Sequence, residues 1–413
     1  MSDQPLSRRY FMQLGAAGAA SAIASGAAAQ DRRLDLPNRA IGRPAPQLGG
    51  PAELPDAEKV GIAVVGLGKL ALGEVLPAFG QCRAAKLAAV VSGDPAKARR
   101  VAAQAGLPDD AIYSYESYDR MAQDRRIDVV YIILPNSLHA DYTVRAFKAG
   151  KHVLCEKPMA TTEADCRRMI AAAEAADRKL MIAYRCFFEP ANLEAMRVMR
   201  SGTLGKIRSF SSDNGRPSSL SDPADQWRLD GPLSGGGALT DIGIYGINGA
   251  RYLLGEEPVE VRAWAYTDKS DPRFAETEDA IHWQFRMASG VIVNGSTSFS
   301  YASTSRLQAV GEKGRLVMDP ATNYRGIQLA VHEGGVERRP QTPAIDQFAR
   351  EMDEMAMVVR RNRPIAATGE EGMQDVRLML AILESVRQGG AAVRTDWGYK
   401  RAVDPVELAD RKA

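Results

Sequence analysis

The hydrophobic pattern of the chain changes near residue 207. Before it, short and nearly continuous apolar runs alternate with segments that have the spacing of helices. Apolar runs without polar alternation are typical of strands buried on both faces of a parallel sheet. The alternation therefore predicts a doubly wound α/β domain over residues 58–184. Its predicted strands are Val60–Val65, Lys86–Val91, Val129–Leu134, His152–Cys155 and Leu180–Tyr184, and its predicted helices run to about Phe79 and over Pro95–Gln104, Ser137–Lys148 and Thr161–Ala175.

The second part of the chain alternates apolar and polar residues with a period of two. Few helix signals interrupt this pattern, so residues 185–413 predict an α+β domain with an open, mainly antiparallel sheet. The predicted strands are Val259–Tyr266, Asp279–Arg286, Val291–Ser298, Ser305–Gly311 and Arg315–Met318. A helix is expected over Ala238–Leu254, and two late helices (about Asp346–Arg361 and Glu371–Arg387) are expected to pack on this sheet or on the first domain.

The N-terminus reads as an export signal followed by a linker. Arg8 and Arg9 precede an Ala/Gly-rich, weakly apolar stretch that closes at Ala29, which is the pattern of a twin-arginine (Tat) signal peptide over residues 1–29. Residues 30–57 contain five prolines and little apolar pattern, so they predict an extended arm. The Tat machinery moves folded proteins, so the signal predicts a periplasmic protein exported with any cofactor already bound.

The charge composition of the chain argues against some classes of binding partner. The chain has 53 basic and 51 acidic residues, so nucleic acid and anionic membranes are not expected partners. No apolar run after Ala29 approaches the length of a membrane span. None of the cysteine spacings resembles a zinc or redox motif, so no metal is expected. The cysteines are predicted to be buried free thiols; they are Cys82, Cys155, Cys166 and Cys186.

A glycine-rich turn follows the first predicted strand. In Gly66-Leu67-Gly68-Lys69-Leu70-Ala71, the first glycine allows a tight turn and the second lets the backbone approach a pyrophosphate at the helix start. In a strand–turn–helix setting this pattern predicts dinucleotide binding rather than a plain turn.

The tip of the second strand bears on the choice of nucleotide. An NAD site places Asp or Glu there, whereas this chain has Ser92, with Lys97 and Arg99 within one helical turn. A small hydroxyl beside cations suits a 2′-phosphate and favours NADP. Two alternatives remain at this point, since the cations are also compatible with a solvated helix face and Asp94 keeps NAD possible.

Two further motifs end strands at the carboxyl edge, where ligands bind in open α/β sheets. Leu134-Pro135-Asn136-Ser137-Leu138-His139 also suits a helix cap, and His139 fits a cap-region or supporting residue better than a base. Lys157 precedes Pro158, which is ordinarily just extended chain, but a lysine here can also hydrogen-bond a sugar hydroxyl. Asp241 and Tyr245 are four residues apart and share one helix face; they are a second candidate for the site, although sequence alone favours a helix surface.

Taken together, these motifs resemble the Gfo/Idh/MocA oxidoreductases, and within them the exported glucose–fructose oxidoreductase group, which includes aldose–aldose oxidoreductases. The likeness covers about residues 30–400. It is carried by the glycine-rich turn, Ile132–Ala140, Glu156-Lys157-Pro158, Gln226-Trp227-Arg228-Leu229, Asp241-Ile242-Gly243-Ile244-Tyr245 and Thr395-Asp396-Trp397-Gly398-Tyr399. It implies a Rossmann domain that holds NADP so tightly that the cofactor is not exchanged.

The resemblance also implies roles for matched residues. Lys157, Asp241 and Tyr245 correspond to the catalytic set, and with Trp227 and Arg228 they are expected to bind the substrate. Arg185 is expected to line the same pocket, and Trp227, otherwise an ordinary core tryptophan, to be a platform for the sugar. The full expected cofactor set is Gly66, Leu67, Gly68, Lys69, Leu70, Ser92, Lys97, Leu134, Pro135, Asn136, Leu138, His139, Glu156, Lys157, Arg185, Trp227 and Arg228.

The function implied is a two-step sugar oxidoreductase. A cyclic aldose would be oxidised at C1 to the aldonolactone and a second sugar, aldose or fructose, reduced to an alditol. Tyr245 would act as the proton-transfer group, with Lys157 lowering the pKa of its phenol. The alternatives are an ordinary NAD(P)-dependent sugar or inositol dehydrogenase with exchangeable cofactor, and a non-catalytic nucleotide-binding protein. A homo-oligomer is expected.

Overall fold

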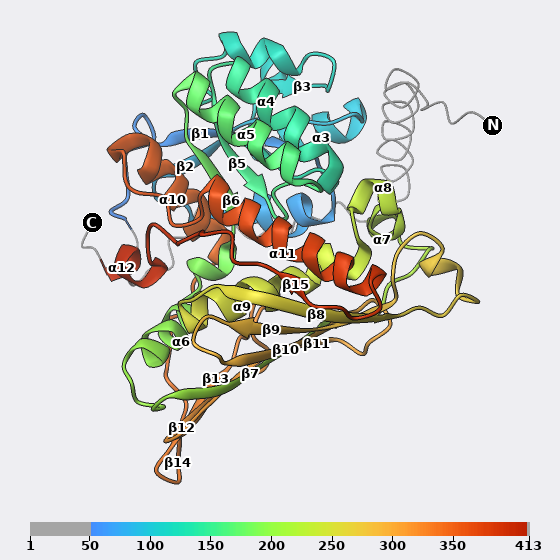
Figure 1. Ribbon diagram of the computed structural model, residues 1–413. Helices are drawn as coiled ribbons and strands as arrows, with labels where there is room; N and C mark the ends of the chain where they lie inside the picture. The colour runs from blue at the N-terminus through green and yellow to red at the C-terminus, as the bar shows by residue number, and fades with distance from the viewer. Residues whose placement is uncertain (1–50, 411–413) are drawn as a thin grey trace, which may run out of the picture.

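The computed structural model describes residues 51–410, which form two sheets (Figure 1). A six-stranded sheet has the order β3-β2-β1-β4-β5-β6, and a nine-stranded sheet has the order β14-β13-β12-β11-β7-β10-β9-β8-β15. The predicted signal peptide and most of the predicted arm, residues 1–50, lie outside the described residues. The predicted fold class, a Rossmann domain followed by an α+β domain with an open, mainly antiparallel sheet, is confirmed.

The six-stranded sheet is parallel throughout and has the doubly wound order. All six residues of β1 are buried, as the continuous apolar run predicts. The strand β3 was not predicted, because two residues carry no periodicity. The strands are β1 Val60–Val65, β2 Ala85–Val91, β3 Ile112–Tyr113, β4 Val129–Ile132, β5 His152–Glu156 and β6 Leu180–Ala183. The helices α3 Pro95–Ala105, α4 His139–Lys148 and α5 Glu163–Ala176 alternate with them.

The helix expected after β1 is irregular. It consists of a π-helical turn over Ala71–Val75, a short α2 over Leu76–Ala78 and a 3₁₀ turn over Phe79–Gln81. Pro77 lies in this segment and lacks a backbone N–H, which is one local reason for the departure from a regular helix.

The nine-stranded sheet contains one parallel pair, β7 with β10, among antiparallel ones. The central strand β7 was missed because its sequence is mostly polar, with only Ile207 and Phe210 as large apolar residues. Its buried Ser212 lies under the helix α9 at Gly246, where an added Cβ would be 2.5 Å from the Ser212 hydroxyl, so close packing here needs small residues. The strands are β7 Ile207–Gly215, β8 Pro258–Tyr266, β9 Ala280–Met287, β10 Ile292–Ser298, β11 Thr304–Gly311, β12 Gly314–Met318, β13 Leu329–Glu333, β14 Val336–Arg338 and β15 Val393–Arg394.

The helices of the second part join the two sheets. In Figure 1, α11 lies between the Rossmann helices and the large sheet; it contacts α5 and β6 on one side and β8 on the other. The helix α10 returns to pack on β1 and β2, and α9 lies on β7 and β10. These helices are α6 Pro190–Arg200, α7 Pro223–Leu229, α8 Gly231–Ser234, α9 Ile244–Leu254, α10 Gln347–Arg361, α11 Gly369–Arg387 and α12 Pro405–Asp410. One hydrophobic cluster consequently runs through both parts.

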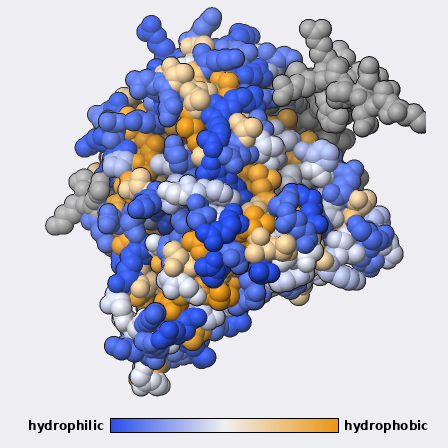
Figure 2. All heavy atoms as spheres, viewed as in Figure 1, coloured by the Kyte–Doolittle hydropathy of each residue, from blue (hydrophilic) through white to orange (hydrophobic). Residues whose placement is uncertain are grey.

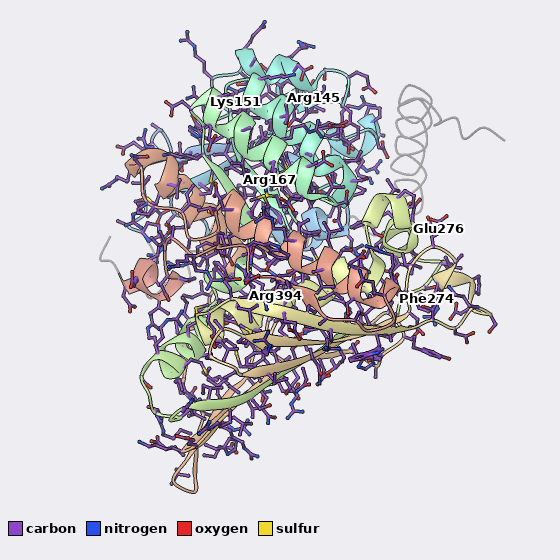
Figure 3. All side chains as sticks on the ribbon, in the orientation of Figure 1. Arg145, Lys151, Arg167, Phe274, Glu276 and Arg394 are labelled. Carbon is purple, nitrogen blue, oxygen red and sulfur yellow. The ribbon has the colours of Figure 1, made fainter. Side chains whose placement is uncertain are left out.

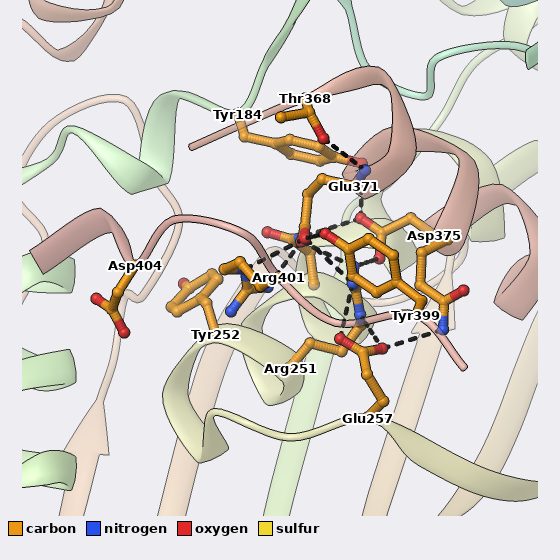
Figure 4. A network of polar contacts seen from close by, with 12 residues as sticks. Tyr184, Arg251, Tyr252, Glu257, Thr368, Glu371, Asp375, Tyr399, Arg401 and Asp404 are labelled. Atoms are coloured by element: carbon orange, nitrogen blue, oxygen red, sulfur yellow. Dashed lines mark hydrogen bonds and ion pairs between the residues drawn. The ribbon is translucent and has the colours of Figure 1, made fainter. Parts of the chain in front are cut away.

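A buried ionic network fixes the second half of α9 (Figure 4). Arg251 is fully buried and pairs with Glu257 at 2.8 Å, Glu371 at 2.9 Å and Asp375 at 2.5 Å. Glu371 also accepts from Tyr399 and Arg401 of the C-terminal segment. The network therefore ties α9, α11 and the chain end together.

The face of the molecule drawn in Figure 2 is largely polar. On the face shown in Figure 2, hydrophilic residues predominate and hydrophobic ones are interspersed among them. Charged side chains such as the exposed Arg167 on α5 extend from the Rossmann helices (Figure 3). No helix among the described residues is both long and apolar enough to cross a membrane. The four cysteines are buried and free, as predicted.

Candidate active site

One cavity extends along the carboxyl edge of the parallel sheet and continues under α7 and α9. Its lining combines the loops after β1, β2, β4, β5 and β6 with residues of the second part of the chain. The predicted site residues that line it are Gly66, Leu67, Gly68, Lys69, Leu70, Ser92, Lys97, Leu134, Pro135, Asn136, Glu156, Lys157, Arg185, Trp227, Arg228, Asp241 and Tyr245. Segments far apart in the sequence thus meet at one site.

The glycine-rich turn leaves room for a ligand. Gly66 has φ +94°, and an added Cβ would be 2.2 Å from the carbonyl oxygen of Ile133, so only glycine fits there. At Gly68, by contrast, no atom lies within 4 Å of an added Cβ, and the residue faces the cavity. A pyrophosphate fits against such bare backbone at the start of a helix. Lys69 Nζ lies 3.2 Å from Asp222 Oδ2, which links the turn to the start of α7.

The tip of β2 fits a 2′-phosphate better than a ribose diol. Asp94 Oδ1 accepts from the backbone N–H groups of Ala96 and Lys97, both at 2.9 Å, so this carboxylate is engaged as the cap of α3. Ser92 and Lys97 are buried and line the cavity, whereas Arg99 is exposed and lies outside it. The residues present therefore fit NADP, with Ser92 and Lys97 at the phosphate.

Two expected cofactor residues, Leu138 and His139, do not line the cavity. His139 is fully buried, with Nδ1 2.8 Å from the Pro158 carbonyl oxygen and Nε2 2.8 Å from that of Leu134. Burial lowers the pKa of this imidazole below its ordinary value, although the two backbone carbonyl contacts oppose that shift. His139 thus joins the loops after β4 and β5 from behind the site.

Lys157 and Asp241 meet at the start of the helical segment that precedes α9. Lys157 Nζ donates to the Asp241 backbone carbonyl at 2.5 Å and lies 3.8 Å from Asp241 Oδ1. Asp241 lies in a π-helical turn over Leu239–Gly243, and such turns are frequent at functional sites. The helix-surface alternative does not describe the folded chain, because Asp241 and Tyr245 both face the cavity.

Cations surround the Asp241 carboxylate. Arg228 Nε donates to Asp241 Oδ2 at 2.8 Å, and an Arg216 nitrogen lies 3.5 Å from the same oxygen. Burial raises the pKa of Asp241, but Arg228, Lys157 and Arg216 outweigh it and lower the pKa to about 2. Asp241 is therefore ionised at neutral pH. Arg216 was not predicted, because it lies in the segment after β7, outside the motifs.

The environment of Tyr245 differs from the expectation. Lys157 Nζ is 4.8 Å and Arg185 Cζ 4.7 Å from the centroid of the Tyr245 ring. Burial raises the pKa of the Tyr245 phenol, and the cation that chiefly opposes it is Arg185 rather than Lys157. Because burial prevails, Tyr245 keeps its proton at neutral pH.

The cavity also contains aromatic residues from distant segments. Arg228 Cζ lies 4.4 Å from the Trp227 ring centroid, so Trp227 is a cavity residue and not an ordinary core tryptophan. Tyr324 and Phe348 line the cavity beside Arg185, and Tyr115 also lines the cavity. No motif marks these three residues; their long-range placement could not be found from sequence pattern.

Comparison with known proteins agrees with this geometry. Residues 60–184 match an oxidoreductase family with an NAD-binding Rossmann fold, Gfo/Idh/MocA, and residues 192–317 match the C-terminal domain of that family. D-xylose 1-dehydrogenase [NADP(+)] of Haloarcula marismortui is 33% identical over 333 residues, covering 79% of this chain and 91% of the relative. The chain belongs to the Gfo/Idh/MocA oxidoreductase family.

Solved structures of similar proteins have the same fold as this Gfo/Idh/MocA protein. Aldose-aldose oxidoreductase from Caulobacter crescentus has a TM-score of 0.79 and 43% identity, covering 81% of this chain and 99% of that one. A 3-ketoreductase from Actinomadura kijaniata, in complex with NADP and TDP-benzene, has a TM-score of 0.70 and 25% identity, covering 79% and 98%.

Proposed function

We propose that this protein is a periplasmic sugar oxidoreductase that keeps NADP(H) bound through its reaction cycle. It oxidises a cyclic aldose at C1 to the aldonolactone and then reduces a second sugar to an alditol. The observation that carries the proposal is a single cavity joining the glycine-rich turn to Lys157, Asp241 and Tyr245. The 43% identity to an aldose-aldose oxidoreductase and the NADP-linked xylose dehydrogenase relative support the substrate class and the cofactor.

The residues of the site divide the work of the proposed reaction. When bound, the nicotinamide supplies the hydride acceptor of the first half-reaction and the hydride donor of the second. Trp227 provides an apolar face for the sugar ring, and Lys157 donates a hydrogen bond to a sugar hydroxyl. Ionised Asp241 holds Lys157 and Arg228 in place through the contacts described above.

Tyr245 moves the proton. Because its phenol is protonated at neutral pH, it is ready to donate a proton to the carbonyl oxygen of the second sugar. In the first half-reaction it accepts the C1 hydroxyl proton while giving up its own. Tyr245 therefore needs a partner group that accepts its proton in the first half-reaction and returns it in the second.

The predicted export signal supports the proposal that the cofactor is retained. A protein carried by the Tat machinery folds in the cytoplasm, where NADP is present, and leaves with whatever it has bound. Outside the cytoplasm no pool of nucleotide is available for exchange, so a cycle of two sugars regenerates the cofactor in place. A homo-oligomer remains a prediction.

An ordinary dehydrogenase with an exchangeable cofactor is the second candidate, and the xylose dehydrogenase relative favours it. The two are separated by purifying the protein without added nucleotide, denaturing it and identifying what is released. Near-stoichiometric NADP(H) is the expected result. An empty protein that oxidises sugar only with added nucleotide would overturn the retained-cofactor proposal in favour of the second candidate.

A further inference from the structure

Two buried carboxyl groups meet at one tyrosine hydroxyl beside the active-site cavity. The Tyr131 hydroxyl, on β4, lies 2.7 Å from Glu156 Oε1 at the end of β5 and 3.2 Å from Glu351 Oε2 on α10. Tyr131 and Glu351 are fully buried, and Glu156 is 7% exposed. Of the three, only Glu156 lines the cavity.

The two hydrogen bonds of the Tyr131 hydroxyl, to Glu156 and Glu351, require one proton more than the phenol itself carries. A phenol has one hydrogen, so Tyr131 can donate to only one of the two carboxyls. The other contact is a hydrogen bond only if that carboxyl is protonated and donates to the phenol oxygen. The shorter contact, to Glu156, is the one expected for donation to a carboxylate. Glu351 is then the carboxylic acid.

The surrounding charges lead to the same assignment. Burial raises the pKa of both carboxyls, and the charge of Glu156 raises that of Glu351 further. Lys157 and Arg185 lower the pKa of Glu156, which also accepts from the Lys157 backbone N–H at 3.2 Å. Among residues 51–410, neither carboxyl has an ion-pair partner, and Glu351 Oε1 has no hydrogen-bond partner, which a neutral acid tolerates better than a carboxylate.

Glu156 and Tyr245 face the same cavity, and the charge of Glu156 contributes to raising the pKa of the Tyr245 phenol. We propose that Glu156 is a further catalytic residue, which takes the proton given up by Tyr245 and returns it, and that Tyr131 and protonated Glu351 hold Glu156 in its ionised state. This inference rests on the proposed two-sugar reaction and supplies the partner that Tyr245 needs there.

The proton and electron balance closes within the site. In the oxidising step the C1–H bond would break, and its electron pair would leave as a hydride that a bound nicotinamide would accept. The C1 hydroxyl proton passes to the Tyr245 oxygen, and the Tyr245 proton passes to the Glu156 carboxylate. The reducing step reverses each transfer at the carbonyl of the second sugar, so that Glu156 is ionised again and the full cycle releases no proton.

The protonation state is tested first, by infrared spectroscopy on protein without sugar at pH 7. The difference spectrum between wild type and Glu351→Gln should show the loss of a carboxylic acid C=O band that shifts in heavy water. Asp241→Asn is the matched control, since Asp241 is ionised and its replacement should remove a carboxylate band. Loss of a carboxylate band in Glu351→Gln would overturn the assignment of the proton to Glu351.

The catalytic role is tested by counting protons. A single aldose is mixed with the cofactor-loaded protein in weak buffer with a pH indicator, and proton release is compared with the rise of the reduced-nicotinamide absorbance. Wild type should release far less than one proton per cofactor reduced, and so should Glu351→Gln, because the amide keeps the place of the neutral acid. Glu156→Gln should release close to one.

One proton released per cofactor reduced by wild type would overturn the role of Glu156, as would an unchanged ratio in Glu156→Gln. Failure of any aldose to reduce the bound cofactor would instead refute the proposed function, and the catalytic role of Glu156 would fall with it. The infrared result is obtained without sugar, so the assignment of the proton to Glu351 is judged separately from both.

Discussion

The two ends of one helical segment, residues 239–254, carry buried charges with different surroundings. At its start, Asp241 accepts from Arg228 and Lys157, and the cluster opens onto the cavity together with Tyr245. At its end, Arg251 is enclosed by Glu257, Glu371 and Asp375, and none of these residues lines that cavity (Figure 4). The same helix thus presents a reactive cluster and a structural one.

The difference between the two clusters lies in where their hydrogen bonds end. All side-chain hydrogen bonds of Arg251 end on protein carboxylates, so this network contributes to holding α9 against α11. Lys157 and Tyr245, by contrast, face open space that a ligand can enter. A buried charge with all partners inside the protein points to a structural role, and one that faces a cavity points to chemistry.

The largest effect is expected from Arg251→Ala. Removing Arg251 leaves buried Asp375 without a cation and Glu371 with Arg401 alone, which should lower the free energy of unfolding by about 3–5 kcal/mol. Chemical denaturation measures this, with Arg262→Ala on the exposed side of β8 as a control that should change it by less than about 0.5 kcal/mol. A loss below about 1 kcal/mol in Arg251→Ala would contradict the structural role.

Tyr245→Phe should act on the other end of the segment. Loss of the phenol hydroxyl removes the group that exchanges a proton with the sugar, so turnover should fall about 10²-fold or more while cofactor content and stability change little. The matched variant is Tyr399→Phe, which removes a hydroxyl from the Arg251 network and should lower stability but not turnover. Equal losses of turnover in the two variants would remove the distinction between the clusters.

The contribution of Asp241 to stability should depend on pH. Its folded-state pKa of about 2 lies below the ordinary value of 3.8, so ionised Asp241 stabilises the fold above about pH 4. The difference in unfolding free energy between wild type and Asp241→Asn, about 2 kcal/mol from this shift, should stay level from pH 7 to pH 4 and shrink toward pH 2. Denaturation at several pH values measures it, and a difference that grows on acidification would have the wrong sign.

The smallest effect is expected at the tip of β2. Ser92→Asp places a carboxylate where a 2′-phosphate would lie, so the retained nucleotide should shift from NADP toward NAD by about tenfold, the equivalent of about 1.4 kcal/mol. Analysis of nucleotide released on denaturation measures the shift, and Arg99→Ala, outside the cavity, serves as the control. Unchanged NADP content in Ser92→Asp would show that this tip does not choose the nucleotide.

The sequence pattern predicted those elements whose structure is determined by residues close together in the chain. The apolar run of β1 and the turn at Gly66 follow from burial on both faces and from a backbone that only glycine can adopt. The strand β7 was missed because α9 packs on small polar residues there, which leaves no hydrophobic period.

The sequence pattern could not predict which residues from distant parts of the chain meet in the site. Motifs predicted Lys157 and Asp241, but not Arg216 beside Asp241 or Glu351 behind Glu156, because their neighbours lie far away in the sequence. The pKa of Tyr245 could not be judged from Lys157 alone, since burial in the folded site outweighs the cations. The sequence can therefore identify site residues such as Tyr245, but their pKa values depend on packing between segments that are far apart in the chain.

A cycle of two sugars on one retained cofactor would form two products in a fixed ratio. Protein purified without added nucleotide would be given glucose alone and then glucose with fructose, and the products would be quantified. Gluconolactone or gluconate in equal amounts with sorbitol is the expected result, and sorbitol from glucose alone would identify a second aldose as the acceptor. Oxidation of glucose that stops after one equivalent per protein, with no alditol formed from either sugar, would contradict the cycle.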